Sequence, residues 1–330
     1  MPLPTTAITI DALVQEFGAF YLNHGQNLSS LFKGLMQPGK TLNLPGIHHI
    51  KTNESLWRAA NPIIQSMLQG FQIDFTPKGS VDFHPNEIRL QQMKVDLQIV
   101  PHLIEESWLG FLNGDSDKIE KWPITKYLMQ QVLDSVEQDK ELEVAYKGVH
   151  QAPTAGTPNN ASQVMDGFHV KLQQAAADQQ YPLHVVNISG GGALTAATVF
   201  DQVEEFCHAL PERYRSLPLY IFMSDDMRLA YLQTKRDRGF YTIKEDTEIT
   251  TRVDFTNSHI VSLPSMAGTN HMWATLPKNI VHLTKRNLST AHMDVQKTDR
   301  IVKILIDWWE AIGFICNDYV FATAPTVATT

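Results

Sequence analysis

The chain has 330 residues, of which 43% are hydrophobic and 19% are charged, and its formal net charge at pH 7 is -8. Such a composition is typical of an ordered globular protein, and single cores stop growing at about 250 to 300 residues, so we expect two or three structural units. No basic run exceeds a pair such as Lys285-Arg286, which disfavours a protein that binds nucleic acid through clustered cations. A protein that only encloses nucleic acid is not excluded.

The two cysteines, Cys207 and Cys316, lie far apart in apolar surroundings. This spacing indicates neither a disulfide framework nor a zinc site. The N-terminus has no basic stretch followed by an apolar one, and no uncharged apolar run approaches the roughly 18 residues of a membrane span. We therefore expect a protein that works without secretion and without a membrane.

The pattern of apolar residues over 1–60 predicts an arm rather than a unit with its own core. Leu13, Phe17 and Phe20 have helical spacing, Pro38-Gly39 stops the pattern, and an extended stretch follows up to Ile50. The apolar positions are too few to form a core alone.

Residues 61–96 predict a long two-stranded ribbon. Apolar and polar positions alternate on both sides of a turn at residues 76–79, which is typical of an amphipathic hairpin. The apolar positions nearest the turn are Phe71, Ile73, Phe75, Val81 and Phe83.

The alternation changes phase after Pro85-Asn86 and again after Gln91-Gln92. Each change moves the side chains to the other face, which predicts a bulge or bend at both places. An isolated hairpin is marginally stable in water, so another surface must cover the apolar face.

Residues 97–180 contain the clearest helix, which begins near Trp122 and carries Val132 and Val136 on one stripe. Alternating apolar residues over 142–146 predict a strand after it. A loop rich in Pro, Gly and Asn follows, and the next helix is expected to be capped near Ser162.

Residues 181–275 read as strand, helix, strand, helix: buried strands at 182–189 and 217–224, each followed by a helix, the second capped by Ser224. This order predicts a compact α/β unit. Residues 276–330 are rich in strands and must pack on the earlier parts. Within them, Trp308 and Trp309 should point to opposite faces, one into the core and the other toward an interface; two aromatics at the solvent rim are the alternative.

Three motifs could carry chemistry, and each has a simpler structural interpretation. The Ser-Gly-Gly-Gly turn at 189–192 precedes a helix but lacks phosphate-loop spacing, so we expect a plain turn. His48-His49 and His271 have no second ligand at a metal-binding spacing. Asp225-Asp226 lies in a helix's first turn, where the helix dipole favours acids. We expect no catalytic, cofactor-binding or metal site.

The order of these parts resembles the major capsid protein of tailed bacteriophages, with its α+β Hong Kong ninety-seven fold. The stretches at 75–83, 93–112, 122–129, 141–158 and 165–172 also resemble the capsid proteins of phages from the Bacteroidetes group. The resemblance implies an N-terminal arm (1–60), an extended loop (61–96), a peripheral domain with a spine helix (97–180), an axial domain (181–275) and strands that return to the peripheral domain (276–330).

The resemblance also implies that a neighbouring copy covers the ribbon. The expected assembly interface then consists of Phe71, Ile73, Phe75, Lys78, Val81 and Phe83. Some relatives join their subunits covalently through a lysine in this loop. Lys78 lies near the tip, but no asparagine or acid can be placed beside it, so we predict no cross-link.

The expected function is that of a structural protein, not an enzyme. By the resemblance it assembles as hexamers and pentamers in the host cytoplasm into an icosahedral shell, which encloses double-stranded phage DNA without sequence-specific binding and is part of the virion. Partners would include portal and decoration proteins. Only about sixty residues precede the ribbon, so a separate protein is expected to supply scaffolding.

Two alternatives stay open at this point. An encapsulin-type compartment shell would share the fold and enclose a cargo enzyme in place of DNA. An α/β enzyme that binds a nucleotide at the 189–192 turn is an alternative of another class.

Overall fold

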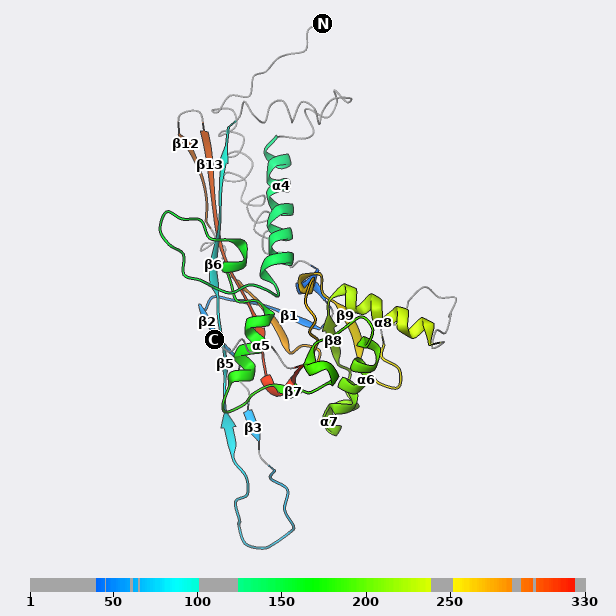
Figure 1. The fold of residues 1–330 in the computed structure, drawn as a ribbon. Helices are drawn as coiled ribbons and strands as arrows, with labels where there is room; N and C mark the ends of the chain where they lie inside the picture. The colour runs from blue at the N-terminus through cyan, green and yellow to red at the C-terminus, as the bar shows by residue number, and fades with distance from the viewer. Residues whose placement is uncertain are drawn as a thin grey trace.

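The computed structural model describes residues 40–44, 46–59, 62–64, 66–100, 124–238, 252–286, 292–298 and 301–323. They form an elongated molecule in which long strands and a helix lie at one end and a thin ribbon extends from the other (Figure 1). A second, more compact group of strands and helices lies to one side. Helices and strands are both present, as the sequence predicted.

The first sheet is built around one long strand, β13. Its partners β12 and β6 run antiparallel to it along its first part, β11 pairs antiparallel with its last part, and β1 lies parallel to β11. The strands are β1 (Ile47–Thr52), β6 (Gln91–Ile99), β11 (Ile280–Lys285), β12 (His292–Thr298) and β13 (Ile301–Phe314). The extended stretch predicted up to Ile50 is therefore a strand of this sheet.

Alternation along β13 decides what the sheet buries. Val302, Ile304, Ile306 and Trp308 are buried on one face, whereas Lys303 is exposed on the other. Trp308 lies in the core and Trp309 packs, half-buried, against the cluster around Ile88. Opposite orientations were predicted, and they are confirmed.

Helix α4 (Ile124–Asp139) lies beside β6 and β13 (Figure 1) and continues into a π-helix, η4 (Lys140–Val144). The strand predicted over 142–146 is therefore wrong. Lys140, Glu141, Val144 and Ala145 are buried, while the two residues between them are exposed. This spacing of buried residues is that of a wide helical turn with one face on the core. The stretch is too short for its sequence pattern to distinguish such a turn from a strand.

A buried ion pair fixes the end of this helix to the sheet. Lys140 Nζ lies 2.7 Å from Glu310 Oε1, and the two side chains are 6% and 0% exposed. The neighbouring residue, Glu141, accepts hydrogen bonds from the backbone N–H of Thr41 at 2.9 and 3.1 Å. Three segments far apart in the sequence thus meet at the π-helix.

Two histidines extend the cluster to the edge of the sheet. His282 Nε2 lies 3.8 Å from Glu310 Oε1, and His282 Nδ1 lies 3.1 Å from Nδ1 of His49 on β1. Burial lowers the pKa of His282 to about 4, nearby Lys140 and His49 add to this, and Glu310 opposes it. Burial also lowers the pKa of His49. The cluster therefore holds one buried ion pair and a neutral His282 at pH 7.

The second sheet has the strand order β7-β14-β10-β8-β9, in which β10 is antiparallel to the other four. Helices α6, α7 and α8 accompany it, and α6 packs on α8. The elements are β7 (His184–Val186), β8 (Tyr220–Met223), β9 (His259–Ser262), β10 (Trp273–Thr275), β14 (Val320–Thr323), α6 (Val199–Ala209), α7 (Glu212–Arg215) and α8 (Asp225–Asp237).

The predicted alternation of strands and helices after residue 181 is confirmed by β7, α6, β8 and α8, and Ser224 is the N-cap residue of α8. One strand of this sheet, β14, comes from the C-terminal segment of the chain and lies between β7 and β10. Helix α5 (Phe168–Ala177) begins later than predicted. The capping box of Asn160 and Gln163 instead starts a short 3₁₀ turn, Ala161–Gln163.

Breaking the buried ion pair should destabilise the fold strongly. Lys140→Met leaves the Glu310 carboxylate buried without its lysine, which costs about 3 to 5 kcal/mol. The matched control is Arg236→Gln, since Arg236 and Asp237 form an ion pair whose side chains are 65% and 68% exposed. Its loss should cost less than about 1 kcal/mol. Urea unfolding measures both, and equal losses would contradict the structural role of the pair.

His282 should make stability depend on pH. Its pKa is lowered from 6.5 to about 4, so the unfolded chain takes up a proton that the folded chain refuses between these values. The contribution of neutral His282 is therefore complete above pH 6.5, falls with pH, and has lost about 3 kcal/mol near pH 4. Between pH 4 and pH 6.5, unfolding of His282→Gln should take up about one proton fewer than unfolding of the wild type. An unchanged slope of unfolding free energy against pH would show that His282 is not responsible.

Candidate assembly surface

The ribbon between β1 and β6 is paired only near its root. Strand β2 (Leu56–Ala59) pairs with β5 (Asn86–Arg89), and β3 (Pro62–Ile64) pairs with β4 (Val81–Phe83). Residues 66–80 form no regular strand. The strand predicted around Phe71, Ile73 and Phe75 is therefore absent, because a hairpin with no surface against its apolar face gains too little to stay paired.

Both predicted phase changes correspond to breaks between strands. The first break lies between β4 and β5. The second lies at Leu90, between β5 and β6, just before the predicted Gln91-Gln92, which begins β6. At Leu90 the chain changes its partner from β2 to β13. The alternation thus indicated the places where the ribbon turns onto the body of the molecule.

The root of the ribbon is held firmly on the first sheet. Ile88 and Leu90 are buried with Val281, Leu283 and Ala311. Gly313 allows this approach, because a Cβ at that position would lie 2.5 Å from Cδ1 of Ile88. The side chain of Asn86 donates hydrogen bonds to Phe314 O at 3.2 Å and to Asn317 Oδ1 at 2.8 Å.

An ionisable contact completes the root. His84 Nε2 lies 3.1 Å from Asp178 Oδ2, just beyond the end of α5. Burial alone would raise the pKa of the Asp178 carboxyl. Hydrogen bonds from the backbone N–H groups of Tyr181 and Gln180 and from His84 outweigh this effect, so the pKa lies below its usual value. The ionised carboxylate is thus the form that holds the root at neutral pH.

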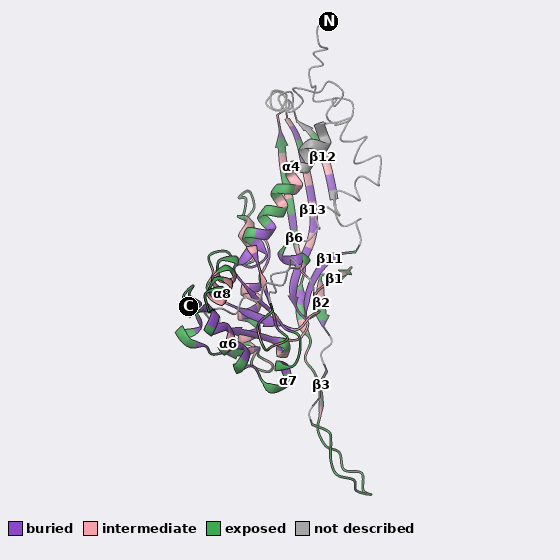
Figure 2. Cartoon of the chain, turned by 90° about the vertical axis from the view of Figure 1, so that its right-hand side faces the viewer, coloured by how far each residue is buried: buried purple, intermediate pink, exposed green. Residues whose placement is uncertain are grey.

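Residues 66–79 are all exposed to solvent, and Figure 2 shows the tip of the ribbon exposed. The exposed fractions are 97% for Phe71 and 94% for both Ile73 and Phe75. Leu68 and Phe83 are exposed as well. Monomeric proteins rarely expose so many large apolar side chains together, and such groups mark a site of interaction.

Hydrogen bonds to backbone carbonyls help to shape the tip. Lys78 Nζ donates to Leu68 O at 2.6 Å, and Gln69 Nε2 donates to Thr76 O at 2.8 Å. The positive φ of Gly79, 81°, completes the turn. Of the six residues predicted to form an interface, Phe71, Ile73, Phe75 and Phe83 are exposed, Lys78 braces the loop, and Val81 pairs with Ile64 in β4.

The glycine turn does not have the geometry of a phosphate site. Gly190, Gly191 and Gly192 all have positive φ, and α6 starts only at Val199, seven residues after Gly192. The carboxylate of Glu205 already accepts the backbone N–H of Ser189 at 2.8 Å. A phosphate at this turn would meet that negative charge instead of a helix N-terminus.

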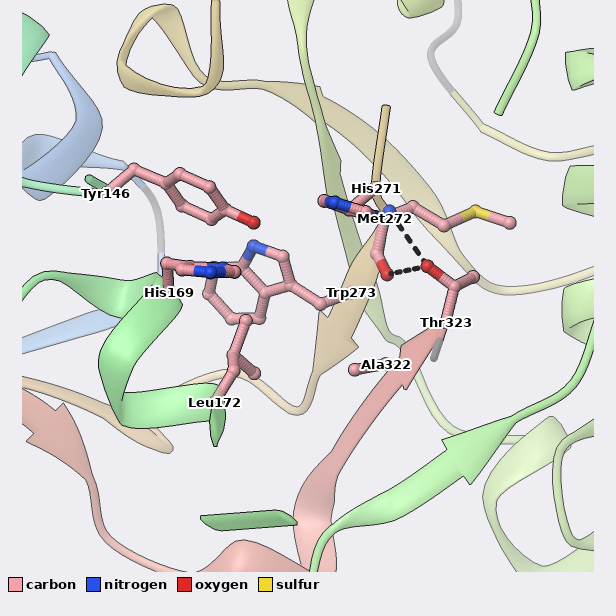
Figure 3. Close-up of a pocket in the computed structure, with 8 residues that line it drawn as sticks. All are labelled: Tyr146, His169, Leu172, His271, Met272, Trp273, Ala322 and Thr323. Atoms are coloured by element: carbon pink, nitrogen blue, oxygen red, sulfur yellow. Dashed lines mark hydrogen bonds between the residues drawn. The ribbon is translucent and has the colours of Figure 1, made fainter. Parts of the chain in front are cut away.

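A small pocket lies between α5 and the second sheet (Figure 3). Its lining includes Tyr146, His169, Leu172, His271 and Trp273, and the two histidine rings stack at 6.5 Å. Burial lowers the pKa of both histidines. The cavity volume is about 10 Å³, which is room for at most one water molecule. The pocket is therefore part of the packed core.

The other candidate groups have structural surroundings. Asp225 lies in the first turn of α8, and the side chain of Arg228 lowers its pKa. Among the residues with assigned positions, no group of three or more His, Cys, Asp or Glu side chains could hold a metal ion. The helices in the same residues are too short or too polar to cross a membrane.

The sequence matches no known protein-family model and no curated protein. Its structure resembles solved ones. A chain of the satellite phage P4 procapsid that includes the size determination (Sid) protein is 13% identical with a TM-score of 0.57, and the match covers 96% of this chain and 97% of that one. A chain of the capsid of the native GTA particle, computed with C5 symmetry, is 10% identical with a TM-score of 0.51, covering 84% and 87%.

The chain has the Hong Kong ninety-seven fold. The fold predicted from the order of parts is thereby confirmed. A chain of the holo-SrpI encapsulin complex from Synechococcus elongatus is 11% identical, with a TM-score of 0.46 and coverage of 86% of both chains. At that TM-score the likeness carries no argument about this chain.

A charge placed at the tip should block assembly and leave the subunit folded. Phe75 is 94% exposed, so Phe75→Asp should change the free energy of unfolding by less than about 0.5 kcal/mol. A charge in a dry interface would cost several kcal/mol at each contact. Circular dichroism and thermal melting report folding, and sedimentation reports assembly.

Phe222→Asp is the control for that experiment, because Phe222 is buried and its ring centroid lies 4.3 Å from that of Trp273. It should unfold the subunit. If Phe75→Asp melts early in the same way, the tip belongs to the core of its own subunit.

Proposed function

We propose that this chain is the structural protein of an icosahedral shell that encloses the DNA of a tailed phage, with copies of the chain assembled as hexamers and pentamers. The observation that carries the proposal is the ribbon: its root is built into the first sheet and its apolar tip has no cover within the described residues. The fold supports this, since similar chains come from a phage procapsid and from a capsid with C5 symmetry.

In this proposal the tip residues Phe71, Ile73, Phe75 and Phe83 bind a neighbouring copy, and Lys78 and Val81 hold the loop in shape. Residues 61–96 act as the extended loop and 1–60 as the arm, whose β1 joins the first sheet. Residues 97–180 with the first-sheet strands of 276–330 form the peripheral domain, and 181–275 with β14 form the axial domain. The net charge of -8 suits a wall that confines DNA without coating itself with phosphate.

Partners beyond the chain itself follow from the same role. A shell filled with DNA needs an opening, which a portal protein supplies, and scaffolding would come from a separate protein. Assembly takes place in the host cytoplasm, and the product is part of the virion. The protein acts through its surfaces and catalyses no reaction.

Microscopy of the purified protein tests the proposal. The expressed chain, concentrated and examined by negative stain and sedimentation, should form shells, tubes or rings, because no described residue of the same chain covers the tip. If only monomers or a closed dimer form across the concentration series, the proposal is wrong. Nuclease-resistant DNA inside particles isolated from the phage host supports the viral shell, whereas a protein cargo without DNA supports the encapsulin-type compartment.

A further inference from the structure

Two basic side chains face the same oxygen atom of Glu310. Lys140 Nζ lies 2.7 Å from Glu310 Oε1, and His282 Nε2 lies 3.8 Å from it. Lys140 belongs to η4, whereas His282 belongs to β11, which pairs with the end of β13 that carries Glu310. All three side chains are buried, and within the described part of the chain neither His282 Nε2 nor Glu310 Oε2 has a hydrogen-bond partner. One carboxylate thus has two possible cationic partners, of which it binds one.

The surroundings of His282 also suit a protonated ring. Such a ring needs an acceptor for each of its two N–H groups. His282 Nδ1 lies 3.1 Å from Nδ1 of His49, and burial, followed by the nearby charge of His48, lowers the pKa of His49. His49 therefore stays neutral, and able to accept, at mildly acid pH. Glu310 accepts the other N–H if the two groups approach by about 1 Å.

The bond from Lys140 and a proton on His282 exclude one another. Two positive charges beside one buried carboxylate leave one charge uncompensated, which is costly away from water. Lys140 and His49 accordingly act with burial to lower the pKa of His282, and Glu310 acts against them. The carboxylate therefore binds either the lysine or the protonated histidine.

The end of α4 depends heavily on this one ion pair. None of residues 131–139 is buried, and Leu133 and Val136 only pack half-buried against the core. Lys140 is the first buried residue after them. The next residue, Glu141, is held separately by Thr41, whose Oγ1 donates to Ser265 Oγ at 2.9 Å. Loss of the Lys140 bond thus frees α4 while the rest of η4 keeps its own anchor.

We infer that acid pH exchanges the cation bound to Glu310, so that protonated His282 replaces Lys140 and the end of α4 is released from the first sheet. The proton comes from solvent, and no covalent bond changes. The charged groups that face His282 are Glu310 of β13, Lys140 of η4 and His49 of β1. The inference concerns the single subunit and does not depend on the proposed function.

Hydrogen exchange of the unassembled subunit tests this inference. The released state binds one proton more, so its population should rise about tenfold for each pH unit below 6.5, down to the lowered pKa of His282. After correction for the intrinsic exchange rate, the amides of α4 and of Lys140 should exchange faster by that factor. Helix α6 should keep its protection, since Val199, Val203 and Phe206 are buried in the second sheet's core.

His282→Gln should abolish the acid effect on α4, because glutamine takes up no proton. The matched control is His208→Gln, which removes an exposed histidine at the end of α6 and should leave the acid effect unchanged. Acceleration that persists in His282→Gln would overturn the inference. Unchanged exchange of α4 in the wild type, or equal acceleration of α4 and α6, would also overturn it, and both results are read from the wild type alone.

The His282 ring reports the competition directly. In Lys140→Gln the carboxylate is left to His282, so the proton affinity of this ring, measured by NMR titration, should be at least tenfold higher than in the wild type. An unchanged affinity would show that the two cations do not share Glu310. If this variant does not fold, the exchange profile of the wild type still decides.

Discussion

The pairing of β13 on both of its edges is the constraint from which the rest of the first sheet follows. This strand binds β12 and β6 along one part and β11 along another, and the register of each pair is continuous over the contact. A slip by one residue would move Val302, Ile304 and Ile306 into solvent and Lys303 into the core. The hydrophobic pattern of this one strand thus fixes the positions of four others, since β1 depends on β11.

The same register brings Glu310 to the buried face, where a carboxylate needs a partner. Lys140 supplies it from the π-helix at the end of α4. A buried ion pair contributes little net stability compared with apolar packing, but it is specific, because a shifted helix would leave both charges unpaired. The pair therefore sets the position of α4 along the sheet more than it stabilises the fold.

Sequence patterns predicted the parts of the fold that depend on local alternation. The two phase changes located the breaks at β4–β5 and at Leu90, and the strand–helix order gave β7, α6, β8 and α8. Patterns failed where distant groups decide the structure. The ion pair joins residues 170 positions apart, so nothing near Lys140 distinguished the π-helix from a strand.

The candidate assembly surface could likewise be predicted from the sequence only in part. Alternation showed that Phe71, Ile73 and Phe75 need cover, because apolar side chains in a hairpin must face something. It could not show that the stretch stays unpaired without that cover, since strand formation depends on a surface outside the chain segment.

In the proposed shell, an apolar tip on a rigid root favours an assembly that is cooperative and still reversible at each contact. A single contact of this kind is weak, because much of the free energy gained by burying the tip is offset by the entropy lost on association. When a copy joins a growing shell, its contact with a second neighbour forms within an already linked complex, at a high effective concentration. A closed shell of this kind would thus gain from every repeated contact. A rigid root at Ile88 and Gly313 makes this coupling effective, because it holds the tip near its binding position before the neighbour arrives.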